Sequence, residues 1–107
     1  MPSKEQKKGR RGEIELAELL TTYGYDVHTG RALSFGTVPD IIGLEGIHVE
    51  CKRVEKLDLY KALRQSQNDS ERFSDGLPVV IHRTNRKPWV VSMALQDWLE
   101  LYDKSCN

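Results

Sequence analysis

Residues 38–53 read VPDIIGLEGIHVECKR, and this stretch decides the expected fold. Two short runs rich in isoleucine and valine flank Glu45-Gly46, a pair typical of a turn. We therefore expect strands over residues 40–44 and 47–54, joined as a hairpin. In the second run apolar and polar residues alternate, with Ile47, Val49 and Cys51 between His48, Glu50 and Lys52. Successive side chains of a strand point to opposite faces, so this strand has one apolar and one charged face.

The turn decides whether Asp40 and Glu50 share a face. With a strict two-residue turn at Glu45-Gly46, Asp40 would lie across from Cys51, and the two carboxylates would point to opposite faces. A three-residue loop over residues 44–46, with Gly46 left-handed, places Asp40 directly across from Glu50. A distortion beside Pro39 would have the same effect. We predict one of these two irregularities.

Asp40, Glu50 and Lys52 form a candidate catalytic group. Hydrolysis of a phosphodiester requires a nucleophilic water and neutralisation of the charge that develops in the transition state. Mg²⁺ meets both needs when a few carboxylate oxygens hold it and it keeps several waters. Asp40 and Glu50 offer such oxygens, the carbonyl of Cys51 is a further possible ligand, and Lys52 could orient the water. The alternative is a surface ion pair across a hairpin, which contributes little stability.

The segment before this hairpin predicts a helix over residues 12–23. On a helical wheel Leu16, Ala17, Leu20 and Tyr23 share one side, and Gly24 is a natural stop. Glu13 projects into the middle of this apolar stripe, which favours a position near the candidate site. An acid favoured by the helix macrodipole near the N-terminus is the alternative interpretation.

The rest of the chain predicts alternating strands and helices. We expect a short strand over residues 25–29, a loop over 30–38, a helix over 58–73, strands over 79–81 and 89–91, and a closing helix from 95. The closing helix has apolar residues at the i, i+3, i+4, i+7 spacing, namely Leu95, Trp98, Leu99 and Tyr102. Trp89 and Trp98 are expected in the core, and His48 on the surface of its strand. The order α-β-β-β-α-β-β-α predicts an α/β fold with helices flanking a mixed central sheet.

Composition places all 107 residues in one domain, since there is no room for a second core. The formal net charge is zero, which argues against a protein that coats DNA without specificity. Basic residues nonetheless crowd the first twelve positions: Lys4, Lys7, Lys8, Arg10 and Arg11. Such residues are unfavourable at a helix N-terminus, so residues 1–11 are expected to form a basic arm that contacts phosphate.

Cysteine content and hydropathy restrict the class of protein. Cys51 and Cys106 lack the close Cys or His partners of a zinc site, and two cysteines make no disulfide framework. No apolar run approaches the roughly 18 residues that a membrane span needs. We expect a cytoplasmic protein of a bacterial, archaeal or phage-infected cell, with no membrane partner.

Pro39-Asp40 and Glu50-Cys51-Lys52 together resemble the motif of the PD-(D/E)XK nuclease superfamily. Lys8-Gly9 followed by Glu13, the loop with Arg31 and Ser34, and the element order resemble archaeal-type Holliday junction resolvases and related phage nucleases. The likeness extends from Lys8 to Val91. The chain departs from these resolvases after Ser34, where Phe35 precedes Gly36 and the family usually carries glycines.

The resemblance implies a restriction-endonuclease-like fold and roles for several residues. Asp40 and Glu50 would be metal ligands, Lys52 the catalytic lysine, and Glu13 a further acidic ligand or a residue that holds water. Ser34 and Gln65 occupy positions where such enzymes often have further polar site residues, and Arg31 of the same loop is a candidate DNA contact. Charge and position add further candidate DNA contacts: Lys7, Lys8, Arg10, Arg11 and Arg83.

We therefore expect a Mg²⁺-dependent DNA endonuclease, with Mn²⁺ able to substitute, that cuts branched DNA such as a Holliday junction. Symmetric cutting needs two active sites, so a homodimer is expected, through the closing helix around Trp98 or the helix around Tyr60. Two rivals stay open. One is a nicking, repair or restriction-like nuclease on duplex or single-stranded DNA, and the other is a non-catalytic nucleic-acid-binding protein.

Overall fold

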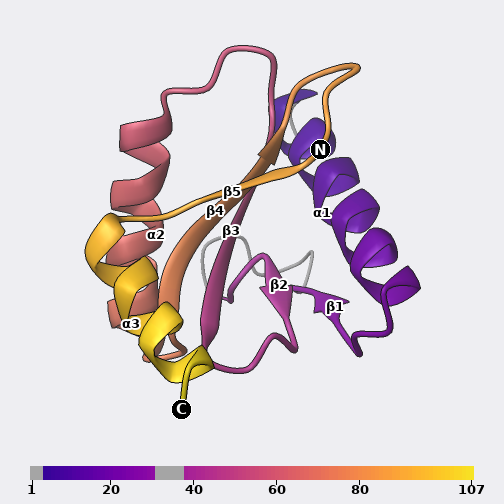
Figure 1. Cartoon of the computed structure of the whole chain (residues 1–107). Helices are drawn as coiled ribbons and strands as arrows, with labels where there is room; N and C mark the ends of the chain where they lie inside the picture. The colour runs from indigo at the N-terminus through magenta and orange to yellow at the C-terminus, as the bar shows by residue number, and fades with distance from the viewer. Residues whose placement is uncertain (1–3, 31–37) are drawn as a thin grey trace.

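A five-stranded mixed sheet organises the described part of the chain (Figure 1). The computed structural model describes residues 4–30 and 38–107, with side chains from Gly9 onward. Its elements are α1 (Lys4–Thr22), β1 (His28–Thr29), β2 (Ile41–Ile42), β3 (Ile47–Arg53), α2 (Leu59–Phe73), β4 (Leu77–Arg83), β5 (Val90–Ser92) and α3 (Leu95–Ser105). The strands lie in the order β1-β2-β3-β4-β5. The expected element order and mixed sheet are confirmed.

The direction of the strands follows from their connections. β3 and β4 are parallel, with α2 as the crossover between them, whereas β1/β2, β2/β3 and β4/β5 pair antiparallel. Parallel neighbours need a long crossover, and antiparallel neighbours need only a turn. The central pair β3/β4 is therefore covered by helices, with α1 and α2 on opposite sides of the sheet (Figure 1).

The apolar core lies between α1 and one face of the sheet. Its buried members are Leu16, Ala17, Val27, Ile41, Val49, Cys51, Val79 and Ile81. Gly12 allows the close approach of α1, because a Cβ there would lie 2.5 Å from the Cβ of Arg53. Trp89 packs against this core as expected.

The opposite face of the sheet packs against small residues of α2. Ala62, Ser66 and Ser70 are buried at intervals of four residues, and the Ser66 hydroxyl donates to the Val79 carbonyl at 2.8 Å. Asp58 caps the helix by accepting a hydrogen bond from the Lys61 backbone N–H at 3.1 Å. Small side chains let α2 lie close to the sheet, which brings its polar residues toward β3.

The β2–β3 hairpin has the predicted irregularity. Ile41 pairs with Val49, and the Ile47 N–H donates to the Leu44 carbonyl at 3.1 Å. This register leaves a three-residue loop over residues 44–46, and Gly46 has a φ of +83°, which glycine adopts without strain. Extended by one residue, this register would place Asp40 opposite Glu50, and Asp40 itself lies just before β2.

The prediction of a basic arm over residues 1–11 is wrong for residues 4–11, which form the first two turns of α1. Lysine, arginine, glutamine and glutamate have good intrinsic helix propensity, and the charge at the helix N-terminus costs less than the added turns contribute. The basic residues are therefore carried on a helix. No helix of the described part combines the length and the apolar character that crossing a bilayer would need.

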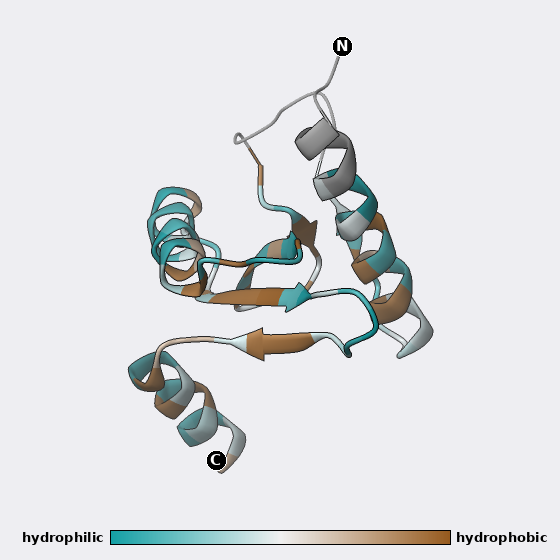
Figure 2. Ribbon diagram, turned by 90° about the horizontal axis from the view of Figure 1, so that it is seen from above, coloured by the Kyte–Doolittle hydropathy of each residue, from teal (hydrophilic) through white to brown (hydrophobic). Residues whose placement is uncertain are grey.

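The apolar face of α3 is exposed, so the prediction that Trp98 is a core residue is wrong. Trp98 is 45% exposed and stacks on Tyr102, with ring centroids 5.3 Å apart. Figure 2 shows α3 beyond the edge strand β5, away from α1. Periodicity identifies a face that favours burial but not the surface that covers it.

Candidate functional site

The predicted acidic residues come together where β2 approaches β3. Asp40 immediately precedes β2, and its Oδ2 accepts a hydrogen bond from the Cys51 backbone N–H at 2.8 Å. Its carboxyl group also shares a side-chain hydrogen bond with Glu13, which α1 presents from the other side. On β3, Lys52 Nζ lies 3.5 Å from Glu50 Oε1. Glu13, Asp40, Glu50 and Lys52 thus form one charged cluster from three elements.

Burial raises the pKa values of all three acids, and the charge of Asp40 raises those of Glu13 and Glu50 further. Burial is the largest cause for Glu13, followed by the charge of Asp40, and together they raise its pKa to about 7. Burial and then Asp40 raise the pKa of Glu50 to about 8, against a smaller lowering effect of Lys52. Burial raises the pKa of Asp40 too, although the Cys51 N–H and Lys52 oppose it. The cluster therefore concentrates more negative charge than its lysine offsets.

The donor types of Glu13, Asp40 and Glu50 suit a hard divalent cation. Carboxylate oxygens are the ligands that Mg²⁺ and Mn²⁺ prefer, and a cation at the cluster would relieve the repulsion that raises the pKa values of Glu13 and Glu50. The thiol of Cys51 is a different case, because it lies in the core and burial raises its pKa. At this position the backbone carbonyl remains the candidate ligand.

Sequence reasoning missed a second group beside Glu50. His48, Glu50 and Asp69 each offer a ligand atom, and these atoms all lie within 4.8 Å of one another. His48 is 1% exposed, so the expectation of a strand-surface histidine is wrong. The available signal was the alternation in β3, which places His48 and Glu50 on one face. The alternation in β3 could not predict that Asp69 of α2 lies beside these two residues.

The candidate DNA contacts are distributed over several elements. Lys7 and Lys8 belong to the first turns of α1, where Arg10 and Arg11 are exposed and the charge of Arg10 acts on Glu13. Gln65 is exposed on α2. Arg31 and Ser34 lie outside the described residues. The contribution of each of these residues to DNA binding stays a prediction.

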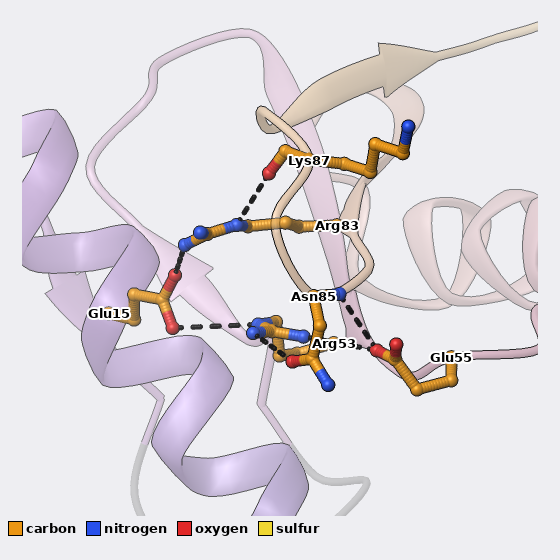
Figure 3. Close-up of polar contacts among 6 residues, drawn as sticks. All are labelled: Glu15, Arg53, Glu55, Arg83, Asn85 and Lys87. Atoms are coloured by element: carbon orange, nitrogen blue, oxygen red, sulfur yellow. Dashed lines mark hydrogen bonds and ion pairs between the residues drawn. The ribbon is translucent and has the colours of Figure 1, made fainter.

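Arg83 is held in a network that joins α1 to the ends of β3 and β4 (Figure 3). Its guanidinium pairs with Glu15 and donates through Nε to the Lys87 carbonyl at 2.7 Å. Arg53 joins the same Glu15 at 3.6 Å and donates to the Asn85 side chain at 2.8 Å. Arg83 therefore positions the β4–β5 turn against α1, and its proposed contact with DNA would have to coexist with the Glu15 pair.

Comparison with known proteins supports the fold. No family model and no curated protein sequence matches the chain. Among solved structures, the chain is similar to Archaeoglobus fulgidus Hjc, a Holliday junction resolvase from an archaeal hyperthermophile, with a TM-score of 0.57 and 21% sequence identity. The match covers 83% of this chain and 74% of the resolvase chain. The expected likeness to archaeal resolvases is thereby confirmed at the level of the fold.

Proposed function

We propose that this chain is a divalent-metal-dependent DNA endonuclease that cuts branched DNA, with a four-way junction as the favoured substrate. The observation that carries the proposal is the convergence of Glu13, Asp40, Glu50 and Lys52 from separate elements. Burial of like charges costs free energy and is common at functional sites. The fold shared with a Holliday junction resolvase favours this chemistry and this substrate over other metal-dependent hydrolyses.

Asp40 and Glu50 would hold the catalytic metal, with the Cys51 carbonyl as a further ligand and Glu13 beside them. When bound, Mg²⁺ or Mn²⁺ would supply charge neutralisation and activation of a water for in-line attack on phosphorus. The Cys51 N–H fixes the orientation of Asp40 through the 2.8 Å hydrogen bond. Burial raises the pKa of Glu13 to about 7, so without metal this carboxyl exchanges a proton near neutral pH beside Asp40.

Lys52 is the proposed catalytic lysine. Its side chain is 30% exposed and its Nζ lies 3.5 Å from Glu50, so it reaches solvent while staying at the acidic cluster. An ammonium group at this position can orient the attacking water or stabilise negative charge on the phosphate oxygens. The basic first turns of α1 would contact the DNA backbone and make binding sensitive to salt.

We further propose a homodimer, because cutting two strands of a symmetric junction needs two active sites. The two candidate interfaces form one surface, since residues of α2 and α3 line the same groove. Tyr60 is 83% exposed, Val91 61% and Leu95 70%, an apolar group that a second copy would bury. Sedimentation of the wild type and of Trp98→Glu tests this. A dimer that the substitution dissociates is expected, and a monomer in both proteins would overturn the dimer.

The substrate proposal is tested by cleavage of a panel of DNAs. Four-way junction, flap, duplex and single-stranded DNA are compared at equal concentration with Mg²⁺ or Mn²⁺, for the wild type, Asp40→Asn and the control Asp103→Asn on α3. We expect the junction to be cut fastest, Asp40→Asn to bind it without cutting, and the control to match the wild type.

Three outcomes would contradict the proposal in different ways. If plain duplex is cut faster than the junction, the protein is a nuclease of ordinary duplex DNA and the proposed junction specificity is wrong. Undiminished cutting by Asp40→Asn would move the active site elsewhere. Binding of DNA by the wild type without cutting in either metal would leave a non-catalytic binding protein.

A further inference from the structure

His48 is a buried histidine with one ring nitrogen left without a partner. The residue is 1% exposed, and its ring stacks on Phe73 of α2, with ring centroids 6.1 Å apart. Among the described residues, no hydrogen-bond partner reaches its buried Nε2. A buried polar atom without a partner costs free energy, and in a native protein it calls for a ligand or a bound ion.

Asp75 fixes which nitrogen is available. Nδ1 of His48 lies 2.9 and 2.8 Å from the two carboxylate oxygens of Asp75. A carboxylate accepts hydrogen bonds, so Nδ1 donates to Asp75, and Nε2 is the nitrogen whose lone pair a metal ion can take. A histidine that ligates a metal is commonly oriented in this way, by a carboxylate at its other nitrogen.

Two carboxylates complete the group around His48. Glu50 lies two residues along the same face of β3, and Asp69 faces the strand from α2, one helical turn before Phe73. Ligand atoms of the three residues lie within 4.8 Å of one another. Two ligands on opposite sides of one ion are about 4 Å apart, so small side-chain movements would bring all three to bonding distance.

We propose that His48, Glu50 and Asp69 form a site for a first-row transition metal such as Mn²⁺ or Zn²⁺, with Asp75 as its positioning residue. Imidazole nitrogen with carboxylate oxygen suits these ions, whereas Mg²⁺ favours oxygen ligands alone. The site is distinct from the proposed catalytic set, because Asp40 and Glu13 are not part of it. It shares Glu50 with that set, so the two ions would be neighbours. Its existence does not depend on nuclease activity.

The test measures Co²⁺ binding by visible absorption without DNA, in a Cys106→Ser background that removes the exposed thiol. We expect saturable binding of one Co²⁺ that Zn²⁺ displaces and excess Mg²⁺ does not. Asp69→Asn and His48→Gln should each weaken binding tenfold or more, and Asp75→Asn should weaken it about 10- to 100-fold. Asp69→Asn is the safer variant for folding because Asp69 is only partly buried.

His28→Gln and Asp40→Asn are the matched controls. His28 is an exposed histidine of β1 beside Asp26, and Asp40 belongs to the proposed catalytic set alone. Both variants should keep the Co²⁺ spectrum, although Asp40→Asn should lose cleavage. No saturable Co²⁺ binding, binding that Mg²⁺ displaces, or binding that Asp69→Asn leaves unchanged would each overturn the site. A wild-type protein that binds Co²⁺ as expected but cuts no DNA would contradict the proposed nuclease and leave this metal site standing.

Discussion

The two faces of β3 are equally buried and chemically opposite. Toward α1, Val49 is 0% exposed and Cys51 is 7% exposed, within the apolar core. Toward α2, His48 is 1% exposed and Glu50 is 5% exposed, among groups that carry charge. Burial of the first pair stabilises the fold through the hydrophobic effect. Burial of the second pair opposes folding. Such costly burial is common at functional sites, which favours a role for this face in binding or catalysis.

The largest expected effect is on the charged face, at Lys52. Lys52→Met removes an ammonium group that is partly exposed and whose ion pair with Glu50 spans 3.5 Å. Loss of a group that stabilises developing charge should lower the rate of cleavage by about 100- to 1,000-fold. The free energy of unfolding should change far less than the rate of cleavage, because Lys52 is partly exposed and its pair with Glu50 is long. Single-turnover cleavage and thermal unfolding measure the two, and an unchanged rate would remove Lys52 from the catalytic residues.

On the apolar face we expect the opposite result, a large loss of stability with little change in cleavage. Val49→Ala removes two methyl groups from a fully buried position and should lower the free energy of unfolding by about 2–3 kcal/mol. Cleavage below the melting temperature should stay near the wild-type rate. Urea unfolding measures the stability. A large loss of cleavage in folded Val49→Ala would contradict the claim that the apolar face of β3 serves stability and the charged face serves catalysis.

Glu50→Gln should stabilise the metal-free protein at alkaline pH. The pKa of Glu50 is about 8 in the folded protein and 4.5 in its ordinary state, so the folded state binds the proton more tightly. Stability of the wild type therefore falls as pH rises from about 4.5 to about 8, because the unfolded chain releases this proton in that range while the folded protein still holds it.

Glutamine cannot ionise, and the gain at pH 8 is at most on the order of 4 kcal/mol, given a pKa of about 8 against 4.5 and about 1.4 kcal/mol per tenfold change in proton affinity. Unfolding of both proteins in EDTA across this pH range measures the gain. If the stability of the wild type and of Glu50→Gln depends on pH in the same way, ionisation of Glu50 does not destabilise the folded protein. The substitution should abolish metal-dependent cleavage at the same time.

The smallest perturbation compares the two thiols of the native protein. Cys106 is exposed and should react rapidly with a thiol reagent at pH 8. Cys51 is buried on the apolar face and burial raises the pKa of its thiol, so it should react only when the fold opens. The kinetics of labelling at each cysteine measure this. Rapid labelling of Cys51 in the folded protein would mean that water enters the apolar face.

Much of the fold could be predicted because local patterns determine it. The alternation in residues 47–52 predicted the two faces of β3. The requirement that Asp40 lie across from Glu50 left two irregularities, and the structure has the three-residue loop that ends at Gly46. The start of α1 could not be predicted from apolar periodicity, because residues 4–11 form helix without an apolar stripe. The exposure of Trp98 depends on which surfaces meet in space, and local spacing carries no such information.

The same limit applies to the site. Glu13 could be identified because a charged residue inside an apolar helical stripe is conspicuous in one sequence window. Asp69 and Asp75 were missed, because their meeting with His48 depends on how α2 crosses from β3 to β4. A polar residue on a polar helix surface gives no local signal of a contact made through the fold.

The central claim is that Asp40 and Glu50, with Glu13 beside them, hold a divalent ion where a DNA backbone can approach. A crystal structure with bound Mn²⁺, located by its anomalous scattering, tests this most directly. We predict a peak at bonding distance from carboxylate oxygens of both Asp40 and Glu50. Side chains of Asp40 and Glu50 that point apart, with no peak between them in crystals saturated with Mn²⁺, would contradict the claim.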